Sequence, residues 1–246
     1  MVGKLENKIA LVTGGSSGIG FATAKKFVEE GAYVFISGRR QAELDAAVVA
    51  IGGNVTAVQG SIANLDDIDR LIETIRSSKG RLDILFANAG WGDFATLEDV
   101  TEEHYDTIFD INVKGTVFSV QKALPLLGNG STIVINSSIQ SWRGVPAFSI
   151  YSATKAALRS LARGWTVDLK DRGIRVNVVS PGYVRTAAHD RLGITEEMTT
   201  AAVTAIPLGR AGTAEEIAKA VLFLSCDDSS YVAGIDLAVD GGLGQI

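Results

Sequence analysis

The sequence predicts an α/β protein of the doubly wound class, in which helices cover both faces of a parallel sheet. Short β-branched runs alternate with amphipathic stretches from one end of the chain to the other. Most of these short runs are apolar throughout, as in strands that are buried on both faces. No linker, internal repeat or low-complexity segment interrupts the alternation. We therefore expect a single domain over residues 1–246.

Seven of the apolar runs have the length and composition of strands, which predicts a seven-stranded sheet. They are Lys8–Thr13, Tyr33–Ser37, Asn54–Gln59, Asp83–Asn88, Thr132–Ser137, Arg175–Ser180 and Ile235–Val239. Between them, apolar residues recur at helical spacing. The clearest case starts at Tyr151, where Leu158, Leu161, Trp165 and Leu169 follow at steps of three or four and predict one buried helix face.

The segment Tyr183–Ile206, directly after the sixth predicted strand, is the least regular part of the chain. Long irregular segments within compact domains are often functional. Loops that follow the strands of an open sheet commonly carry binding residues. We expect residues 183–206 to form a lid over the substrate.

Composition and charge exclude several classes of function. The 246 residues include 23 Lys and Arg against 28 Asp and Glu, a formal net charge of −5, which argues against nucleic acid as a partner. No apolar run is long enough to span a membrane, and Met1–Glu6 lacks the apolar core of a signal peptide. The single cysteine, Cys226, has no partner for an internal disulfide. These features predict a cytoplasmic protein that does not act at a membrane.

No metal site is expected. The two histidines, His104 and His189, lie far apart in the sequence, and neither has a cluster of ligand-type residues beside it.

A glycine-rich turn, Thr13–Gly20, follows the first predicted strand and leads into a helix. Glycines allow the backbone to turn sharply and to approach a pyrophosphate, and the helix N-terminus offers free N–H groups. A turn of this kind between a strand and a helix predicts dinucleotide binding. The residues expected at the phosphates are Gly14, Ser16, Ser17, Gly18, Ile19 and Gly20.

The end of the second predicted strand indicates which dinucleotide is bound. An NAD site usually places Asp or Glu there to accept a hydrogen bond from the ribose 2′-hydroxyl. This chain has Ser37 followed by Arg39 and Arg40. A guanidinium suits a 2′-phosphate, so the pattern favours NADP(H). Arg39 is the better candidate, and Arg40 is expected at the adenine or exposed.

Tyr151 and Lys155 are four residues apart and fall on one face at the start of a predicted helix. A free phenol has a pKa of about 10, and a nearby ammonium lowers it, so the tyrosine becomes a usable acid or base. Ser138 ends the fifth predicted strand, where its hydroxyl could hold a carbonyl oxygen.

With these residues in this order, the whole chain resembles the short-chain dehydrogenase/reductase family, which has a Rossmann-type fold. The matching motifs are Thr13-Gly14-x-x-x-Gly18-x-Gly20, Asn88-Ala89-Gly90, Asn112, Ser138, Tyr151-x-x-x-Lys155, Pro181-Gly182 and Asp240-Gly241-Gly242.

The resemblance implies a role for each matched residue. Tyr151 would donate the proton to a carbonyl, and Lys155 would lower the pKa of Tyr151 and bind the nicotinamide ribose. Ser138 would orient the substrate oxygen, and Asn112 would hold a water in the proton relay. Asn88, Ala89 and Gly90 would line the adenosine side of the cofactor. The nicotinamide carboxamide would contact the segment that includes Pro181, Gly182, Val184 and Thr186.

The chain departs from the family pattern after the third predicted strand. Many members have Asp there to accept from the adenine amino group, whereas this chain has Ser61-Ile62. We expect Ser61 and Ile62 still to contact the adenine, with looser recognition. The substrate pocket is expected to have the walls Trp91, Gln140, Trp142, Phe148 and Tyr183.

One observation supports these assignments without the family. Six of the candidate residues follow the carboxyl ends of six successive predicted strands, the edge at which open parallel sheets bind ligands. They are Gly14, Arg39, Ser61, Asn88, Ser138 and Pro181.

The sequence thus predicts an NADPH-dependent enzyme that reduces a ketone or aldehyde reversibly. A 3-oxoacyl-carrier-protein reductase is an alternative, although Ala123–Ser131 has no Lys or Arg for an acidic carrier. A sugar dehydrogenase is another. A non-catalytic NADP-binding regulator is a third, but it would not need Ser138, Tyr151 and Lys155 together. Apolar residues on more than one face of Asp106–Leu126 and Tyr151–Lys170 predict packing against a helix of another subunit. The family resemblance implies a homo-oligomer, a dimer or tetramer.

Overall fold

A seven-stranded parallel sheet forms the centre of the computed structural model, which describes residues 3–186 and 192–245. The strands are β1 (Ile9–Thr13), β2 (Tyr33–Gly38), β3 (Val55–Gln59), β4 (Leu82–Ala87), β5 (Leu127–Asn136), β6 (Arg175–Pro181) and β7 (Asp236–Val239). Their order is β3-β2-β1-β4-β5-β6-β7, and all six pairings are parallel. The predicted Rossmann-type sheet is confirmed. Because the order reverses between β1 and β4, a crevice opens at the carboxyl ends of these strands.

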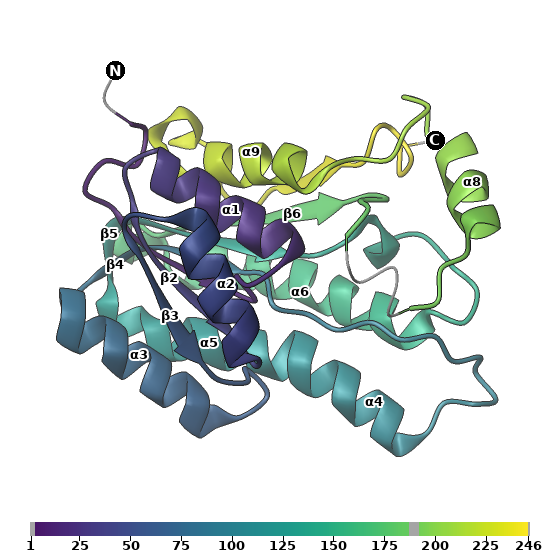
Figure 1. The fold of residues 1–246 in the computed structure, drawn as a ribbon, viewed down its shortest axis with the longest axis horizontal. Helices are drawn as coiled ribbons and strands as arrows, with labels where there is room; N and C mark the ends of the chain where they lie inside the picture. The colour runs from purple at the N-terminus through teal and green to yellow at the C-terminus, as the bar shows by residue number, and fades with distance from the viewer. Residues whose placement is uncertain (1–2, 187–191, 246) are drawn as a thin grey trace.

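Helices cover both faces of this sheet (Figure 1). They are α1 (Gly18–Glu29), α2 (Gln41–Ile51), α3 (Leu65–Lys79), α4 (Glu102–Phe109), α5 (Gly115–Ala123), α6 (Ser149–Asp168), α8 (Glu196–Thr204) and α9 (Ala214–Ser225). Residues of α3, α5 and α6 pack on one face, and residues of α1, α2 and α9 pack on the other.

The strands supply apolar side chains to both layers, as their unbroken apolar sequence predicts. In β1, Ile9 and Leu11 point into the layer under α3, α5 and α6, while Ala10 and Val12 point into the layer under α1, α2 and α9. This alternation follows from the two-residue period of a strand. Burial on both faces makes the sheet a rigid base for the loops at its carboxyl edge.

Two elements differ from the prediction. The fifth strand begins at Leu127, earlier than expected, because Leu127 pairs with Leu82 before the register shifts at Ile84. The helix predicted over Asp106–Leu126 is divided by a π-helical turn, Asp110–Lys114. Such turns insert one extra residue into a helix and often occur at functional sites.

The predicted lid, residues 183–206, contains the helix α8. Thr195 caps this helix by accepting a hydrogen bond from the backbone N–H of Met198 at 3.2 Å. Residues 187–191 of the segment, including His189, lie outside the described residues.

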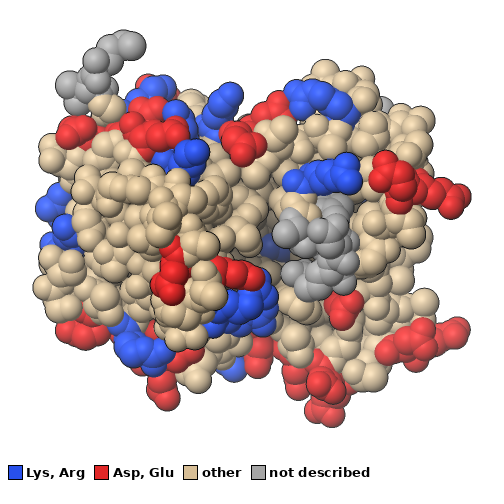
Figure 2. Space-filling model, viewed as in Figure 1, with Lys and Arg blue, Asp and Glu red and all other residues tan. Residues whose placement is uncertain are grey.

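Within the described residues, no helix is both long and apolar enough to cross a membrane, and no three His, Cys, Asp or Glu side chains group as metal ligands would. Charges of both signs are scattered over the face shown in Figure 2. The face is hollowed near its centre, and basic side chains lie at the margin of the hollow.

Candidate active site

The glycine turn after β1 is shaped by backbone positions that only glycine fills easily. Gly14 has a φ of 65° and Gly18 a φ of 55°, in the left-handed region. A Cβ on Gly20 would lie 2.1 Å from the carbonyl oxygen of Gly14, and one on Gly14 would lie 2.9 Å from the Cα of Ala89. The turn therefore brings bare backbone to the edge of the sheet, where a phosphate could approach it closely.

The helix that follows this turn has an uncapped N-terminus. Ser17 occupies the N-cap position of α1, but its side chain accepts no hydrogen bond from the helix. In α3, α4 and α9, by contrast, Asn64, Thr101 and Thr213 cap the first turn. The first N–H groups of α1 and the positive end of its dipole are thus left for an anion.

A cleft of about 590 Å³ lies beside this turn. Fourteen residues predicted to bind the cofactor line it: Gly14, Ser16, Ser17, Gly18, Ile19, Gly20, Arg39, Arg40, Ser61, Ile62, Asn88, Ala89, Gly90 and Thr186. Its lining residues come from the carboxyl ends of β3, β2, β1 and β4, so the cleft crosses four strands beside a bare glycine turn, as a dinucleotide site does. Pro181, Gly182 and Val184, also predicted to bind the cofactor, are not among its lining residues.

Sequence reasoning missed five residues of this lining: Ser37, Gly38, Glu43, Gly60 and Ile111. Ser37 and Gly38 end β2, Gly60 follows β3 and Glu43 lies in the first turn of α2, so their position at the carboxyl edge of the sheet could have identified them. Ile111 belongs to the π-helical turn, and its position in the cleft was not predicted from the sequence. Trp91, predicted as a wall of the substrate pocket, also lines this cleft.

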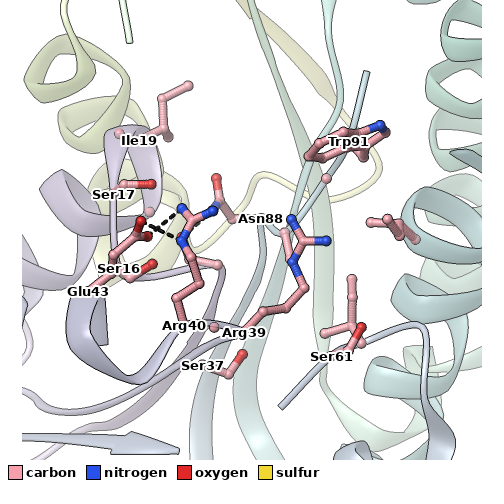
Figure 3. A pocket seen from close by; sticks show the side chains of 18 of the residues that line it. Ser16, Ser17, Ile19, Ser37, Arg39, Arg40, Glu43, Ser61, Asn88 and Trp91 are labelled. Carbon is pink, nitrogen blue, oxygen red and sulfur yellow. Dashed lines mark hydrogen bonds and ion pairs between the residues drawn. The ribbon is translucent and has the colours of Figure 1, made fainter. Parts of the chain in front are cut away.

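The two arginines after β2 have different surroundings (Figure 3). Arg40 forms an ion pair with Glu43, one turn along on α2. Arg39 extends across the cleft, and its guanidinium carbon lies over the Trp91 ring, 5.3 Å from the ring centroid. Among the described residues, no carboxylate pairs with Arg39, so its charge is available to a ligand.

The loop after β3 is held by Asp67, from the first turn of α3. The backbone N–H of Ser61 donates to the Asp67 carboxylate at 2.8 Å. This hydrogen bond, together with one from Arg70, holds the pKa of Asp67 below its usual value. The acidic residue that the family pattern places after this strand is absent, but a carboxylate from α3 supports the backbone of the same loop.

Ser138, Tyr151 and Lys155 come together at the end of β5 and the start of α6. Ser138 follows β5, and its hydroxyl accepts a hydrogen bond from the backbone N–H of Gln140 at 3.2 Å. Tyr151 lies in the first turn of α6 and forms a hydrogen bond with Ser138. Lys155 lies one turn further on and is 3% exposed.

Burial determines the protonation of this cluster. It raises the pKa of Tyr151 to about 12, against a smaller lowering by the hydrogen bond from Ser138. It lowers the pKa of Lys155 to about 8. Desolvation, opposed by the hydrogen bond from Ser138, sets the pKa of Tyr151, and the expectation that Lys155 lowers this pKa stays a prediction. A neutral tyrosine in this position holds a proton that it can donate.

Asn112 connects this cluster to the cleft. It lies in the π-helical turn, is fully buried, and accepts a hydrogen bond from the backbone N–H of Trp91 at 2.7 Å. Its amide nitrogen donates to the carbonyl of Trp91 at 2.8 Å and to the Thr154 hydroxyl at 2.9 Å. Both donors of the side chain are thus used within the protein. The water-holding role implied by the resemblance stays a prediction.

The aromatic residues predicted for the substrate pocket divide into two groups. Phe148 stacks on Tyr151, with 4.3 Å between ring centroids, and also contacts Phe94, which the sequence analysis missed. Trp142 instead donates to the carbonyl of Gly244 at 3.1 Å, near the C-terminus. Tyr183 is hydrogen-bonded to Thr199 of α8 at 3.0 Å.

Gln140, the fifth predicted wall, lies two residues after Ser138, and its backbone N–H donates to the Ser138 hydroxyl. Its side-chain oxygen is buried and has no hydrogen-bond partner among the described residues.

Comparison with known proteins agrees with this arrangement. A family model described as enoyl-(acyl carrier protein) reductase matches residues 14–244. Oxidoreductase asL5 of Sarocladium schorii is 47% identical over 246 residues, which cover 99% of this chain and 98% of that protein. The NADP-dependent (R)-specific alcohol dehydrogenase of Lentilactobacillus kefiri is 35% identical over 249 residues, which cover 98% of each.

A solved structure has the same fold. The crystal structure of a dehydrogenase/reductase from Sinorhizobium meliloti 1021 matches with a TM-score of 0.92 and 34% identity, over 97% of this chain and 96% of that one. The fold of this chain therefore agrees with that of the solved structure over nearly its whole length. The chain belongs to the short-chain dehydrogenase/reductase family and is an oxidoreductase of the kind that uses NAD(P)H.

Proposed function

We propose that the protein is an NADPH-dependent carbonyl reductase that converts a ketone or aldehyde to an alcohol, reversibly. The observation that carries this proposal is the half-buried Tyr151, whose raised pKa keeps it protonated and which forms a hydrogen bond with Ser138 beside the glycine-lined cleft. A proton donor at this place is what carbonyl reduction requires, since the oxygen that gains negative charge must be protonated.

The side chains divide the work as follows. Ser138 holds the carbonyl oxygen of the substrate by a hydrogen bond, and Tyr151 donates its phenolic proton to the same oxygen. Lys155 places a positive charge near the phenol and so stabilises the phenolate that is left. When bound in the cleft, the reduced nicotinamide supplies the hydride that the carbonyl carbon accepts. The protein contributes mainly by holding the two reactants side by side.

Preference for NADP(H) is supported by Arg39. No carboxylate among the described residues pairs with Arg39, and a guanidinium in that state suits a 2′-phosphate. No Asp or Glu ends β2 to accept from a 2′-hydroxyl. The similar alcohol dehydrogenase of Lentilactobacillus kefiri is NADP-dependent by name. The ion pair of Arg40 with Glu43 makes Arg40 the weaker candidate.

A second candidate is reduction of the 3-oxo group of an acyl chain that an acyl carrier protein carries as a thioester. The similar 3-oxoacyl-[acyl-carrier-protein] reductase of Thermotoga maritima, 36% identical, favours it, and the matching family model also names an acyl carrier protein. The absence of basic residues in Ala123–Ser131 speaks against it, because such a carrier is acidic.

The test is the loss of reduced-nicotinamide absorbance, with NADPH and NADH in parallel. The substrates are an aryl ketone, a β-ketoester and an acetoacetyl thioester, with glucose in the oxidative direction. Consumption of NADPH by simple ketones supports the proposal. Activity confined to the thioester moves the assignment to the second candidate, and activity only with glucose moves it to a sugar dehydrogenase. No turnover with any of them overturns the catalytic assignment.

A further inference from the structure

We propose that Trp91 is a specificity-determining residue for the cofactor, because its indole holds the Arg39 guanidinium in position to bind a 2′-phosphate. This inference rests on the proposed preference for NADP(H). It adds a residue that neither the glycine turn nor the sequence pattern at the end of β2 identifies.

The two residues reach each other from opposite sides of the glycine turn. Arg39 follows β2, Trp91 follows β4, and β1 lies between these strands in the sheet. Both side chains line the cleft, and Figure 3 shows the guanidinium directed toward the indole. The guanidinium carbon is 5.3 Å from the ring centroid, within the range of a cation–π contact. The pair therefore lies within the cleft, between residues that follow β2 and β4.

The contact leaves the guanidinium able to bind an anion. A cation–π contact involves the face of the aromatic ring and the charge of the guanidinium, and it consumes none of the five N–H donors. No carboxylate among the described residues competes for Arg39. A phosphate could thus take a pair of N–H donors while the indole still holds the cation.

The backbone that carries the indole is held in place. Its backbone N–H and carbonyl both bind the side chain of Asn112, at 2.7 and 2.8 Å. Asn112 is itself fully buried and bound to Thr154 of α6. A long arginine side chain loses substantial rotamer freedom when it is fixed on a ligand. Because the indole already restricts the Arg39 side chain before the cofactor binds, less rotamer freedom is lost on binding, and the affinity is higher.

The consequence differs between the two cofactors. NADPH presents a dianionic 2′-phosphate to Arg39, whereas NADH presents a neutral hydroxyl that gains little from a positioned charge. Trp91 should therefore strengthen the binding of NADPH and leave that of NADH nearly unchanged.

The test is a double-mutant cycle read by equilibrium binding, with isothermal titration of NADPH and NADH at one ionic strength. The proteins are the wild type, Trp91→Leu, Trp91→Phe, Arg39→Ala and the double variant Arg39→Ala/Trp91→Leu. We expect Trp91→Leu to weaken NADPH binding about threefold to tenfold and NADH binding less than about twofold. Trp91→Phe keeps an aromatic face and should lie between Trp91→Leu and the wild type. In the Arg39→Ala background, Trp91→Leu should add nothing.

Three results would overturn the role of Trp91. If Trp91→Leu weakens the binding of NADPH and NADH equally, Trp91 is only a wall of the cleft. If it weakens NADPH binding as much in the Arg39→Ala background, Trp91 contacts the cofactor independently of Arg39. If it tightens NADPH binding, the indole obstructs the cofactor. NADPH binding by Arg39→Ala distinguishes these three results from failure of the proposed NADP(H) preference. If that variant binds NADPH as tightly as the wild type does, the NADP(H) assignment itself is wrong, whatever Trp91 does. Circular dichroism of each variant checks the fold, and Trp91→Phe serves if Trp91→Leu fails to fold.

Discussion

The ammonium group of Lys155 donates a hydrogen bond to the backbone carbonyl of Asn136, with 2.9 Å between the nitrogen and the oxygen. The same nitrogen is 5.4 Å from the centroid of the Tyr151 ring. The charge therefore acts on the phenol through space, while the end of β5 holds it in place. Asn136 also donates to Asn88 at 2.9 Å, which ties this carbonyl to the wall of the cleft. The lysine is positioned by the sheet edge that carries the cofactor site.

Replacing Tyr151 with Phe removes only the phenolic oxygen. We expect kcat to fall by at least about 10²- to 10⁴-fold, because the proton donor is lost. NADPH binding should change less than twofold, since the ring and its stacking on Phe148 remain. Steady-state kinetics and NADPH titration measure the two effects. Tyr105→Phe, on the exposed side of α4, is the control, and near-normal turnover by Tyr151→Phe would exclude Tyr151 as the donor.

The pH dependence of reduction should report Lys155. Its pKa is lowered to about 8, whereas that of Tyr151 is raised to about 12. As pH rises through 8, Lys155 loses its charge while Tyr151 keeps its proton. We expect kcat/KM for carbonyl reduction to fall above about pH 8 and to show no second decrease before pH 10. A flat profile from pH 6 to pH 10 would show that the charge on Lys155 does not matter to this step.

The same burial makes stability depend on pH. Between pH 8 and 10.5, Lys155 is protonated in the unfolded chain and neutral in the folded one, so its contribution to the free energy of unfolding rises with pH. Tyr151 has the opposite effect, but only between pH 10 and 12. We expect the difference in unfolding free energy between wild type and Lys155→Met to shift in favour of the wild type by about 2 kcal/mol from pH 8 to pH 10. Urea unfolding at the two pH values measures this shift, and an unchanged difference would mean that the lysine is solvated.

Replacing Arg39 with Asp reverses the charge at the expected 2′-phosphate. We expect the ratio of kcat/KM for NADPH to that for NADH to fall by at least about tenfold, through loss of a charge-assisted hydrogen bond and added repulsion. The matched control is Arg40→Asp, which changes the same charge one residue away at a side chain already paired with Glu43. If the control shifts the ratio as much as Arg39→Asp does, the effect is long-range charge and not a contact.

A methyl group on Gly20 should disrupt the turn. Its Cβ would meet the carbonyl oxygen of Gly14 at 2.1 Å, so the backbone must move. We expect Gly20→Ala to lower the free energy of unfolding by about 1–3 kcal/mol and to weaken cofactor binding. Gly164→Ala, on the exposed side of α6, meets no atom within 4 Å and should be neutral or stabilising. Thermal unfolding and NADPH titration of both variants decide the matter, and equal behaviour of the two would refute the steric argument.

Most of the fold could be predicted because its signals are local. Strands such as Tyr33–Ser37 and Arg175–Ser180 are recognisable from their unbroken apolar sequence, and the structure places them within one residue of that expectation at each end. The start of β5 at Leu127 was not predictable, since it depends on pairing with Leu82 in a distant strand. The π-helical turn at Asn112 also depends on a distant partner, the backbone of Trp91.

The sequence predicted which residues form the candidate site, but not how deeply they are buried. Motif spacing placed Ser138, Tyr151 and Lys155 together, but not the depth of burial that sets their pKa values. The hydrogen bond from Trp142 to Gly244 joins residues 102 positions apart, so no local sequence pattern predicts it. The single-domain organisation, the lid, the pairing of subunits and the cytoplasmic location stay predictions.

The bridge between Val184 and Gly212 brings together the two ends of the segment that leads from β6 to α9. The N–H of Gly212 also donates to the carbonyl of Tyr183 at 2.9 Å. The entropic cost of closing a loop between two anchor points grows only slowly with the length of the loop. We therefore expect the number of residues between Tyr183 and Gly212 to have little effect on the stability of the sheet. Natural or laboratory recombination could thus exchange this whole stretch for one of another length. Ser138, Tyr151 and Lys155, at the end of β5 and in α6, would keep their places in such an exchange.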